Sequence, residues 1–119
     1  MKKIYKIIVI VVLTIAIIIF GALLLSRESV KEKDDMAKCL TERGAVMYGT
    51  NVCPACASQK ELFGESFQYI DFVDCNARRT ECLEKRIEYF PTWIINGQYY
   101  VGVQKLSNFT SYTNCTIGG

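Results

Sequence analysis

The sequence predicts a small α/β domain with a four-stranded mixed sheet flanked by helices, preceded by one transmembrane helix. Three observations support this architecture. An uncharged run begins near the N-terminus, strand-like and helix-like segments alternate after it, and a Cys-x-x-Cys pair follows the first predicted strand. The 119 residues therefore divide into an N-terminal segment (1–6), an apolar helix (7–25), a linker (26–36) and a domain (37–119).

Residues 7–25 read IIVIVVLTIAIIIFGALLL and carry no charge. A helix of this length spans roughly 28 Å, close to the ~30 Å hydrocarbon core of a bilayer. Lys2, Lys3 and Lys6 precede the run, whereas the linker mixes both signs, so the positive-inside rule predicts a cytoplasmic N-terminus and an extracytoplasmic domain. The alternative is a cleaved signal peptide, which would have a shorter apolar region and a small-x-small site. Both interpretations export the domain.

The expected domain elements follow from periodicity and from turn residues. A strand–helix–strand unit requires a parallel pair with a right-handed crossover, and the Asn96-Gly97 turn indicates a hairpin that adds two antiparallel strands. The predicted helices are 37–43, 56–63, 79–89 and 104–113, and the predicted strands are 45–49, 67–75, 92–95 and 98–102. Helices are expected to end at Gly44, at Gly64 and before Pro91.

Charge excludes one class of partner. Residues 37–119 contain eight Lys or Arg and eight Asp or Glu, and no basic patch is interleaved with aromatic residues. Nucleic acid is therefore not an expected partner.

The chain has six cysteines and no histidine. Disulfides form and persist outside the cytoplasm, and six cysteines allow 15 connectivities, of which three remain once Cys53 is paired with Cys56. Cys75 ends a predicted strand and Cys82 lies in the helix that returns, whereas Cys39 and Cys115 bracket the domain. We expect Cys75–Cys82 and Cys39–Cys115 to be structural disulfides. A second redox pair at Cys75 and Cys82, which would relay electrons to a partner, is the alternative.

The motif C-P-A-C at Cys53–Cys56 has three interpretations. A zinc site would need two more suitably spaced ligands, and the chain has no histidine to supply them. A purely structural disulfide would close a tight ring that constrains little sequence. A redox pair fits best, because Cys53 lies at a helix N-cap before Pro54, where unpaired N–H groups and the helix dipole favour a thiolate. Cys56, one turn further on, would be the buried resolving thiol.

The same residues carry a family resemblance. C-P-A-C after an apolar strand, followed by F-P-T and a hairpin, resembles the thioredoxin-like fold. More narrowly, 38-KCLTERGAVMYG-49, 56-CASQKELFGESFQYIDFVDC-75 and 89-YFPTWIINGQYYVGVQKL-106 resemble the thioredoxin-like domain associated with bacterial and archaeal vitamin K epoxide reductase (VKOR) homologues. The resemblance implies a disulfide oxidoreductase that passes oxidising equivalents between exported thiols and a membrane quinone reductase.

The resemblance also implies a substrate-binding segment, Phe90, Pro91 and Thr92, with Pro91 as a cis-proline facing the cysteine pair. The alternative is that Pro91 is an ordinary helix terminator with a trans bond. The resemblance implies a quinone-linked VKOR-type oxidoreductase as the membrane partner, although this chain has one anchor where the family has a four-helix VKOR portion.

Two positions depart from the family pattern. Val52 stands where the family usually has an aromatic residue before the first cysteine, and Ala55 where it often has histidine. Without an imidazole beside Cys53 its thiolate is stabilised less, and a stabilised reduced form is what makes such a protein a strong oxidant. We therefore expect a milder oxidant, or even a reductant.

Two functions follow as hypotheses. The first is a membrane-anchored thiol–disulfide oxidoreductase whose substrates are exported cysteine-containing proteins, with electron flow in either direction. The second is a non-catalytic peptide-binding module in which Cys53–Cys56 stays closed. Neither hypothesis calls for a metal or a cofactor.

Overall fold

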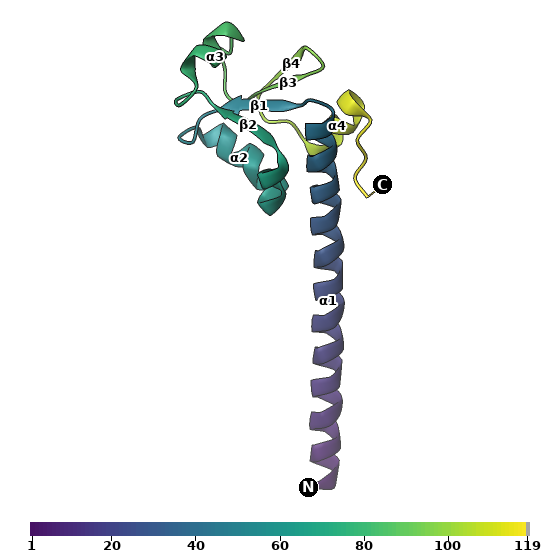
Figure 1. Ribbon diagram of the computed structural model, residues 1–119. Coiled ribbons are helices and arrows are strands. Elements are labelled where there is room, and N and C mark those ends of the chain that lie inside the picture. Colours follow the sequence, from purple (N-terminus) through teal and green to yellow (C-terminus); the bar gives the residue numbers. More distant parts are fainter. Residues whose placement is uncertain (119) are drawn as a thin grey trace. The chain divides into compact units, whose positions relative to one another are not determined.

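The computed structural model describes residues 1–118, which form two compact units, one up to Lys31 and one from Glu32 onward (Figure 1). The helices are α1 (Lys2–Glu42), α2 (Pro54–Phe63), α3 (Arg79–Glu84) and α4 (Leu106–Thr113), together with the 3-10 helix η1 (Gly64–Tyr69). The strands are β1 (Val46–Gly49), β2 (Asp71–Asp74), β3 (Thr92–Ile95) and β4 (Gln98–Val101).

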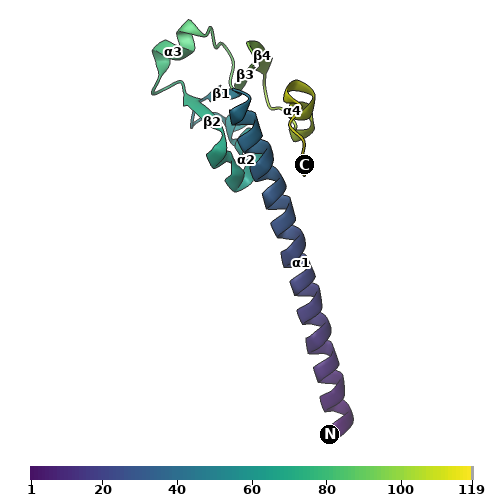
Figure 2. The same ribbon diagram turned by 45° about the vertical axis from the view of Figure 1, so that its right-hand side comes forward.

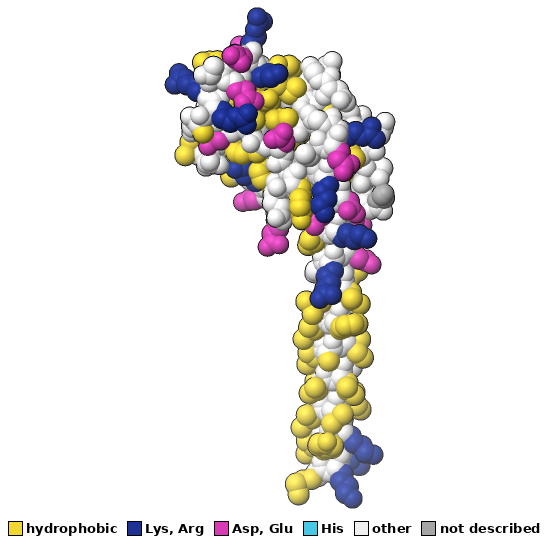
Figure 3. Space-filling model, viewed as in Figure 1, with side chains coloured by type: hydrophobic (Ala, Val, Ile, Leu, Met, Phe, Trp, Pro, Cys, Tyr) yellow, Lys and Arg dark blue, Asp and Glu magenta, His cyan; other side chains and the backbone are white. Residues whose placement is uncertain are grey.

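The first unit is helical, and its residues 7–25 carry no charge. On the face that Figure 3 shows, hydrophobic side chains cover this part of the helix, and lysines gather at its N-terminal end. Within the part of the chain that the structure describes, α1 is the one helix long and apolar enough to cross a membrane, by length and composition. A helix that is hydrophobic all round requires apolar surroundings, which a bilayer provides.

α1 is longer than expected. Residues 26–36, which we expected to be a solvated tether, are helical, and the separate helix predicted at 37–43 is the last part of α1. The segment SRESVKEKDDM has no glycine or proline and is rich in Arg, Glu and Lys, which are good helix formers. The predicted end of this helix is confirmed, since Gly44 follows with a left-handed φ of 75°.

The sheet confirms the predicted mixed topology, with strand order β2-β1-β3-β4. β1 pairs with β2 in parallel and with β3 antiparallel, so Val46 lies between Asp71 and Ile94. β3 and β4 form the predicted hairpin. Both turn residues, Asn96 and Gly97, have positive φ (50° and 77°), as a two-residue hairpin turn of this kind requires.

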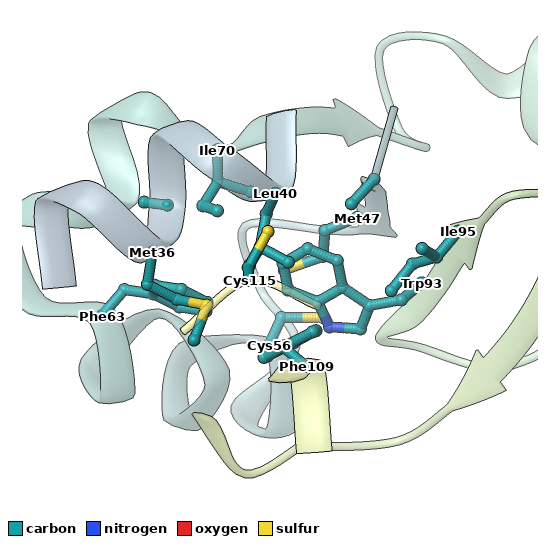
Figure 4. Packing of buried hydrophobic residues seen from close by; sticks show 12 residues of the cluster. Met36, Leu40, Met47, Cys56, Phe63, Ile70, Trp93, Ile95, Phe109 and Cys115 are labelled. Atoms are coloured by element: carbon teal, nitrogen blue, oxygen red, sulfur yellow. The ribbon is translucent and has the colours of Figure 1, made fainter. Parts of the chain in front are cut away.

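Each face of the sheet has its own apolar cluster. Met47 and Trp93 point into the larger cluster, which α1, α2 and α4 cover with Leu40, Phe63 and Phe109 (Figure 4). The rings of Trp93 and Phe109 meet edge to face, 4.7 Å apart between centroids. The smaller cluster on the other face contains Tyr48, Val73, Cys75 and Cys82. Figures 1 and 2 show α2 and α3 on opposite sides of the sheet accordingly.

Two predicted elements are shorter than expected. The strand predicted at 67–75 covers only Asp71–Asp74, because the preceding residues form η1, from which Phe67 and Tyr69 pack against the larger cluster. The helix predicted at 79–89 ends at Glu84. Arg86 then takes a left-handed φ of 53°, and the N–H of Ile87 donates to the Cys82 carbonyl at 2.9 Å. Packing of η1 overrides the local strand propensity at the first place, whereas a local cap with a left-handed residue ends the helix at the second.

Candidate functional site

Cys53 lies at the N-cap of α2. The backbone leaves β1, turns through residues 50–52 and reaches Cys53 in an extended conformation, after which Pro54 begins the helix. Proline suits this first helical position, because its fixed φ is helical and its missing N–H would have no partner there. The N–H of Cys56 donates to Cys53 Sγ at 3.1 Å. The helix start therefore directs an N–H group at the first sulfur, as predicted.

The two cysteines lie in different environments. Neither is bridged; Cys53 is half-buried, whereas Cys56 has no exposed surface. Burial raises the pKa of the Cys56 thiol to about 11, and its hydrogen bond with Cys53 acts in the same direction. A backbone hydrogen bond at Thr50 and the charge of Lys60 oppose the rise in this pKa without cancelling it. At neutral pH Cys56 is therefore a protonated thiol beneath the more accessible Cys53.

The last residue of β1 leaves room for the buried sulfur. A Cβ built on Gly49 would lie 2.7 Å from Cys56 Sγ and 3.4 Å from the ring of Phe72. The first of these distances is far below a normal contact, so no side chain fits here unless the sulfur moves. Sequence reasoning missed this role, although a glycine in a strand often marks a close approach of this kind.

The Phe90–Thr92 segment lies beside Cys53. The Cys53 thiol donates to the Phe90 carbonyl at 3.8 Å, and the Phe90–Pro91 peptide bond is cis. Pro91 is fully buried, and its carbonyl accepts from the N–H of Gly102 at 2.8 Å. Thr92 is also buried, and its hydroxyl donates to the Tyr89 carbonyl at 2.6 Å. Of the three residues predicted to bind substrate, Phe90 is the one that presents exposed surface, at 38%.

The backbone of Phe90 has spare hydrogen-bonding capacity. Within residues 1–118 its carbonyl accepts from the Cys53 thiol alone, and its N–H has no partner. Exposed backbone groups next to a sheet are the kind that an added extended peptide pairs with.

The other four cysteines are paired. Cys39 is bonded to Cys115 and Cys75 to Cys82, with S–S distances of 2.03 and 2.08 Å. The first disulfide ties α1 to the segment after α4, and the second joins the end of β2 to α3. Within residues 1–118, no three His, Cys, Asp or Glu side chains are grouped as metal ligands would be.

Gln59 is a buried polar residue that sequence reasoning also missed. Its Oε1 accepts from Trp93 Nε1 at 3.2 Å and from the Gln104 N–H at 2.6 Å, and its Nε2 donates to the Gln104 carbonyl at 3.0 Å. Gln59 thus joins α2, which carries the cysteine pair, to β3 and to the segment after β4. A polar residue at a core position of α2, three residues after Cys56, was the available signal.

The parallel β1–β2 pair, the adjoining β3–β4 hairpin and a Cys-x-x-Cys pair at the junction of β1 and α2 together match the expected arrangement. The domain has a thioredoxin-like fold.

No protein-family model matches the chain. Among curated proteins, thiol-disulfide oxidoreductase LTO1 of Arabidopsis thaliana is 35% identical over 91 residues, which are 69% of this chain and 24% of that protein. The chain thus spans about a quarter of the length of this relative.

A thioredoxin and a glutaredoxin of known structure are also similar to this chain. Thioredoxin from Fasciola hepatica is 15% identical, with a TM-score of 0.44, over 60% of this chain and 79% of that one. Glutaredoxin from Methanosarcina mazei Go1 is 26% identical, with a TM-score of 0.42, over 57% of this chain and 76% of that one.

Proposed function

We propose that this protein is a membrane-anchored thiol–disulfide oxidoreductase that acts outside the cytoplasm through Cys53 and Cys56. One observation carries the proposal: a half-buried sulfur at a helix N-cap receives the N–H of Cys56, while the second sulfur lies fully buried one turn away. The disulfide that Cys53 and Cys56 can form has one sulfur that a substrate can reach and one that it cannot. A substrate thiolate therefore attacks Cys53, and Cys56 is the leaving group. The similarity to a protein named a thiol-disulfide oxidoreductase supports the same chemistry.

In the oxidising direction, a substrate thiolate attacks Cys53 Sγ. The Cys53–Cys56 bond breaks, its electron pair leaves on Cys56, and that sulfur takes up a proton. A second substrate thiolate then attacks the substrate sulfur of the mixed disulfide and releases Cys53 as a thiolate, which the N–H of Cys56 stabilises. Two electrons pass from two substrate thiols to the cysteine pair. The same steps in reverse reduce a substrate disulfide.

Cys53 is the sulfur that meets the substrate because Cys56 has no exposed surface. Phe90, Pro91 and Thr92 form the substrate-binding segment, with the free backbone groups of Phe90 as hydrogen-bond partners for an extended peptide. Substrates in this proposal are exported cysteine-containing proteins.

The reduced pair must pass its electrons on before it can oxidise again. We assign this step to a quinone-linked membrane oxidoreductase of the VKOR type. In this proposal α1 anchors the domain in the same membrane as that oxidoreductase. The lysines at the N-terminal end of the apolar helix support a cytoplasmic N-terminus, because the positive-inside rule favours Lys and Arg on the cytoplasmic side. The reduction potential decides the direction, since about −120 mV is typical of an oxidant and about −270 mV of a reductant.

The test uses the full chain in detergent micelles, first oxidised and then mixed with reduced dithiothreitol. We expect one equivalent of dithiothreitol to be oxidised, and Cys53→Ser to abolish the reaction. Given a substrate disulfide, the Cys53 thiolate of Cys56→Ser should attack it, release one substrate thiolate and accumulate as the mixed disulfide, because the resolving thiol is gone. Ser58→Ala, an exposed change on the same helix, is the matched control. Equal reaction of the native protein and Cys53→Ser would favour the non-catalytic binding module instead.

A further inference from the structure

A cavity of about 250 Å³ opens beside Phe90, which is one of its lining residues. The carbonyl of the same residue accepts from the Cys53 thiol at 3.8 Å. The cavity is therefore one residue away from the sulfur that reacts with substrate. Of the residues that line the cavity, Phe90 is the one that also belongs to the proposed substrate-binding segment.

The lining of the cavity combines apolar and polar surface in about equal parts. Cys75 and Cys82, joined as a disulfide, are 7% and 4% exposed, and Ile87 is half-buried beside them. Leu83 also lines the cavity and is 65% exposed, although exposure of a leucine side chain to water is unfavourable. An apolar side chain that entered the cavity would cover Leu83 and Phe90, which is 38% exposed.

The charge at the cavity comes from Arg79. The neighbouring Arg78 forms an ion pair with Glu81, whereas Arg79 is exposed and has no ion-pair partner within residues 1–118. Asn76 lies beside it with an exposed side chain. A free guanidinium next to the apolar part of the cavity complements a carboxylate that stands next to an apolar side chain.

We propose that this cavity is a specificity pocket for the substrate segment that flanks the reacting cysteine, and that it selects an apolar side chain accompanied by an aspartate or glutamate. The inference rests on the proposed function, because the reaction at Cys53 is what brings a peptide to Phe90. An extended peptide that pairs with the Phe90 backbone has side chains that alternate in direction, so a residue close to the cysteine is directed towards the cavity.

The experiment measures how fast the oxidised full-length protein, in detergent micelles, is reduced by short peptides with one cysteine. Two peptide thiols become one peptide disulfide while the Cys53–Cys56 pair gains two electrons and two protons. Leucine or serine is placed in turn at each of the two positions on either side of the cysteine. At the best position, aspartate or lysine is then placed beside the leucine. Dithiothreitol, which has no flanking residues, is measured with every protein to normalise the rates.

We expect leucine to react about tenfold faster than serine at one position, the size expected for burying an aliphatic side chain. Aspartate should react about two- to fivefold faster than lysine, as for a partly exposed ion pair. Leu83→Ala should reduce the leucine preference at least twofold, and Arg79→Glu should reverse the preference for aspartate. The matched controls, Ile117→Ala and Lys105→Glu, change an exposed apolar residue and a charge elsewhere and should retain both preferences.

The outcomes separate the two proposals. If dithiothreitol reduces the oxidised protein but every peptide reacts at the same normalised rate, the pocket is wrong and the proposed function stands. Preferences that survive both Leu83→Ala and Arg79→Glu would also overturn the pocket. If dithiothreitol itself fails to reduce the Cys53–Cys56 pair, the proposed function is wrong and the pocket falls with it.

Discussion

Replacing Gly49 with alanine tests the close approach of β1 to the buried sulfur. The new Cβ would lie 2.7 Å from Cys56 Sγ, roughly 1 Å inside the normal contact distance of about 3.5–4 Å. Cys56 has no exposed surface, so its sulfur cannot move into solvent. Overpacking of this kind typically costs about 1–3 kcal/mol, and we expect the free energy of unfolding to fall by that amount.

The cause can be isolated with a second substitution. In a Cys56→Ala background the clashing sulfur is gone, and the nearest remaining atoms, in Phe72 and at the Cβ of residue 56, are 3.4 and 3.6 Å away. Those are ordinary contacts. Gly49→Ala should then be neutral, or stabilising by up to about 1 kcal/mol, because alanine loses less conformational entropy than glycine on folding.

The assay is urea unfolding of the full chain in micelles, followed by the fluorescence of Trp93, the single tryptophan, which is fully buried. All four proteins of the cycle carry Cys53→Ser, so that residue 56 forms no bridge with it. We expect a coupling energy of at least about 1 kcal/mol between positions 49 and 56. Equal effects of Gly49→Ala in both backgrounds would refute the argument that the sulfur requires a glycine at this position.

Three further predictions concern the site and its support. With a pKa of about 11, about one Cys56 thiol in a thousand is a thiolate at pH 8. The rate at which iodoacetamide labels Cys56, followed by mass spectrometry, should therefore rise about tenfold per pH unit from pH 7 to 10. A labelling rate independent of pH would contradict the raised pKa. Gln59→Leu leaves the Trp93 N–H and two backbone groups without partners in the core. It should therefore lower the free energy of unfolding, measured by urea titration, by about 2–4 kcal/mol. The control Ser58→Ala should lower it by less than about 0.5 kcal/mol. Replacing Cys39 and Cys115 together by serine opens a loop with a sequence separation of 76 and should cost about 4–5 kcal/mol on the chain-entropy model; a loss below about 1 kcal/mol in urea unfolding would show that this bridge does not hold the domain.

The features that sequence alone determined depend on short stretches of chain. An uncharged run predicts the apolar helix, because length and composition suffice to identify it. Asn96-Gly97 predicts the hairpin, because few other residues accept positive φ at both positions. The N-cap place of Cys53 follows from an apolar strand before it and Pro54 after it. From these the mixed sheet follows by chain connectivity.

Other features were decided by residues far apart in the sequence. The shortened β2 reflects the packing of η1 against distant elements, which outweighs local propensities of a few tenths of a kcal/mol per residue. The hydrogen bonds of Gln59 join residues 34 and 45 positions apart, and the contact of Cys53 with Phe90 spans 37. Periodicity within one segment carries no information on such contacts.

The sequence therefore determined which cysteines could do chemistry and where on a helix the first of them lies. Only the tertiary structure decided that Cys56 has no exposed surface, that Gly49 leaves space for its sulfur, and that a cavity opens beside Phe90. The physical reason is that helix starts and turns are set by the backbone preferences of neighbouring residues. Burial, close contacts and cavities are instead properties of the packed chain, in which each atom's surroundings come mostly from other elements.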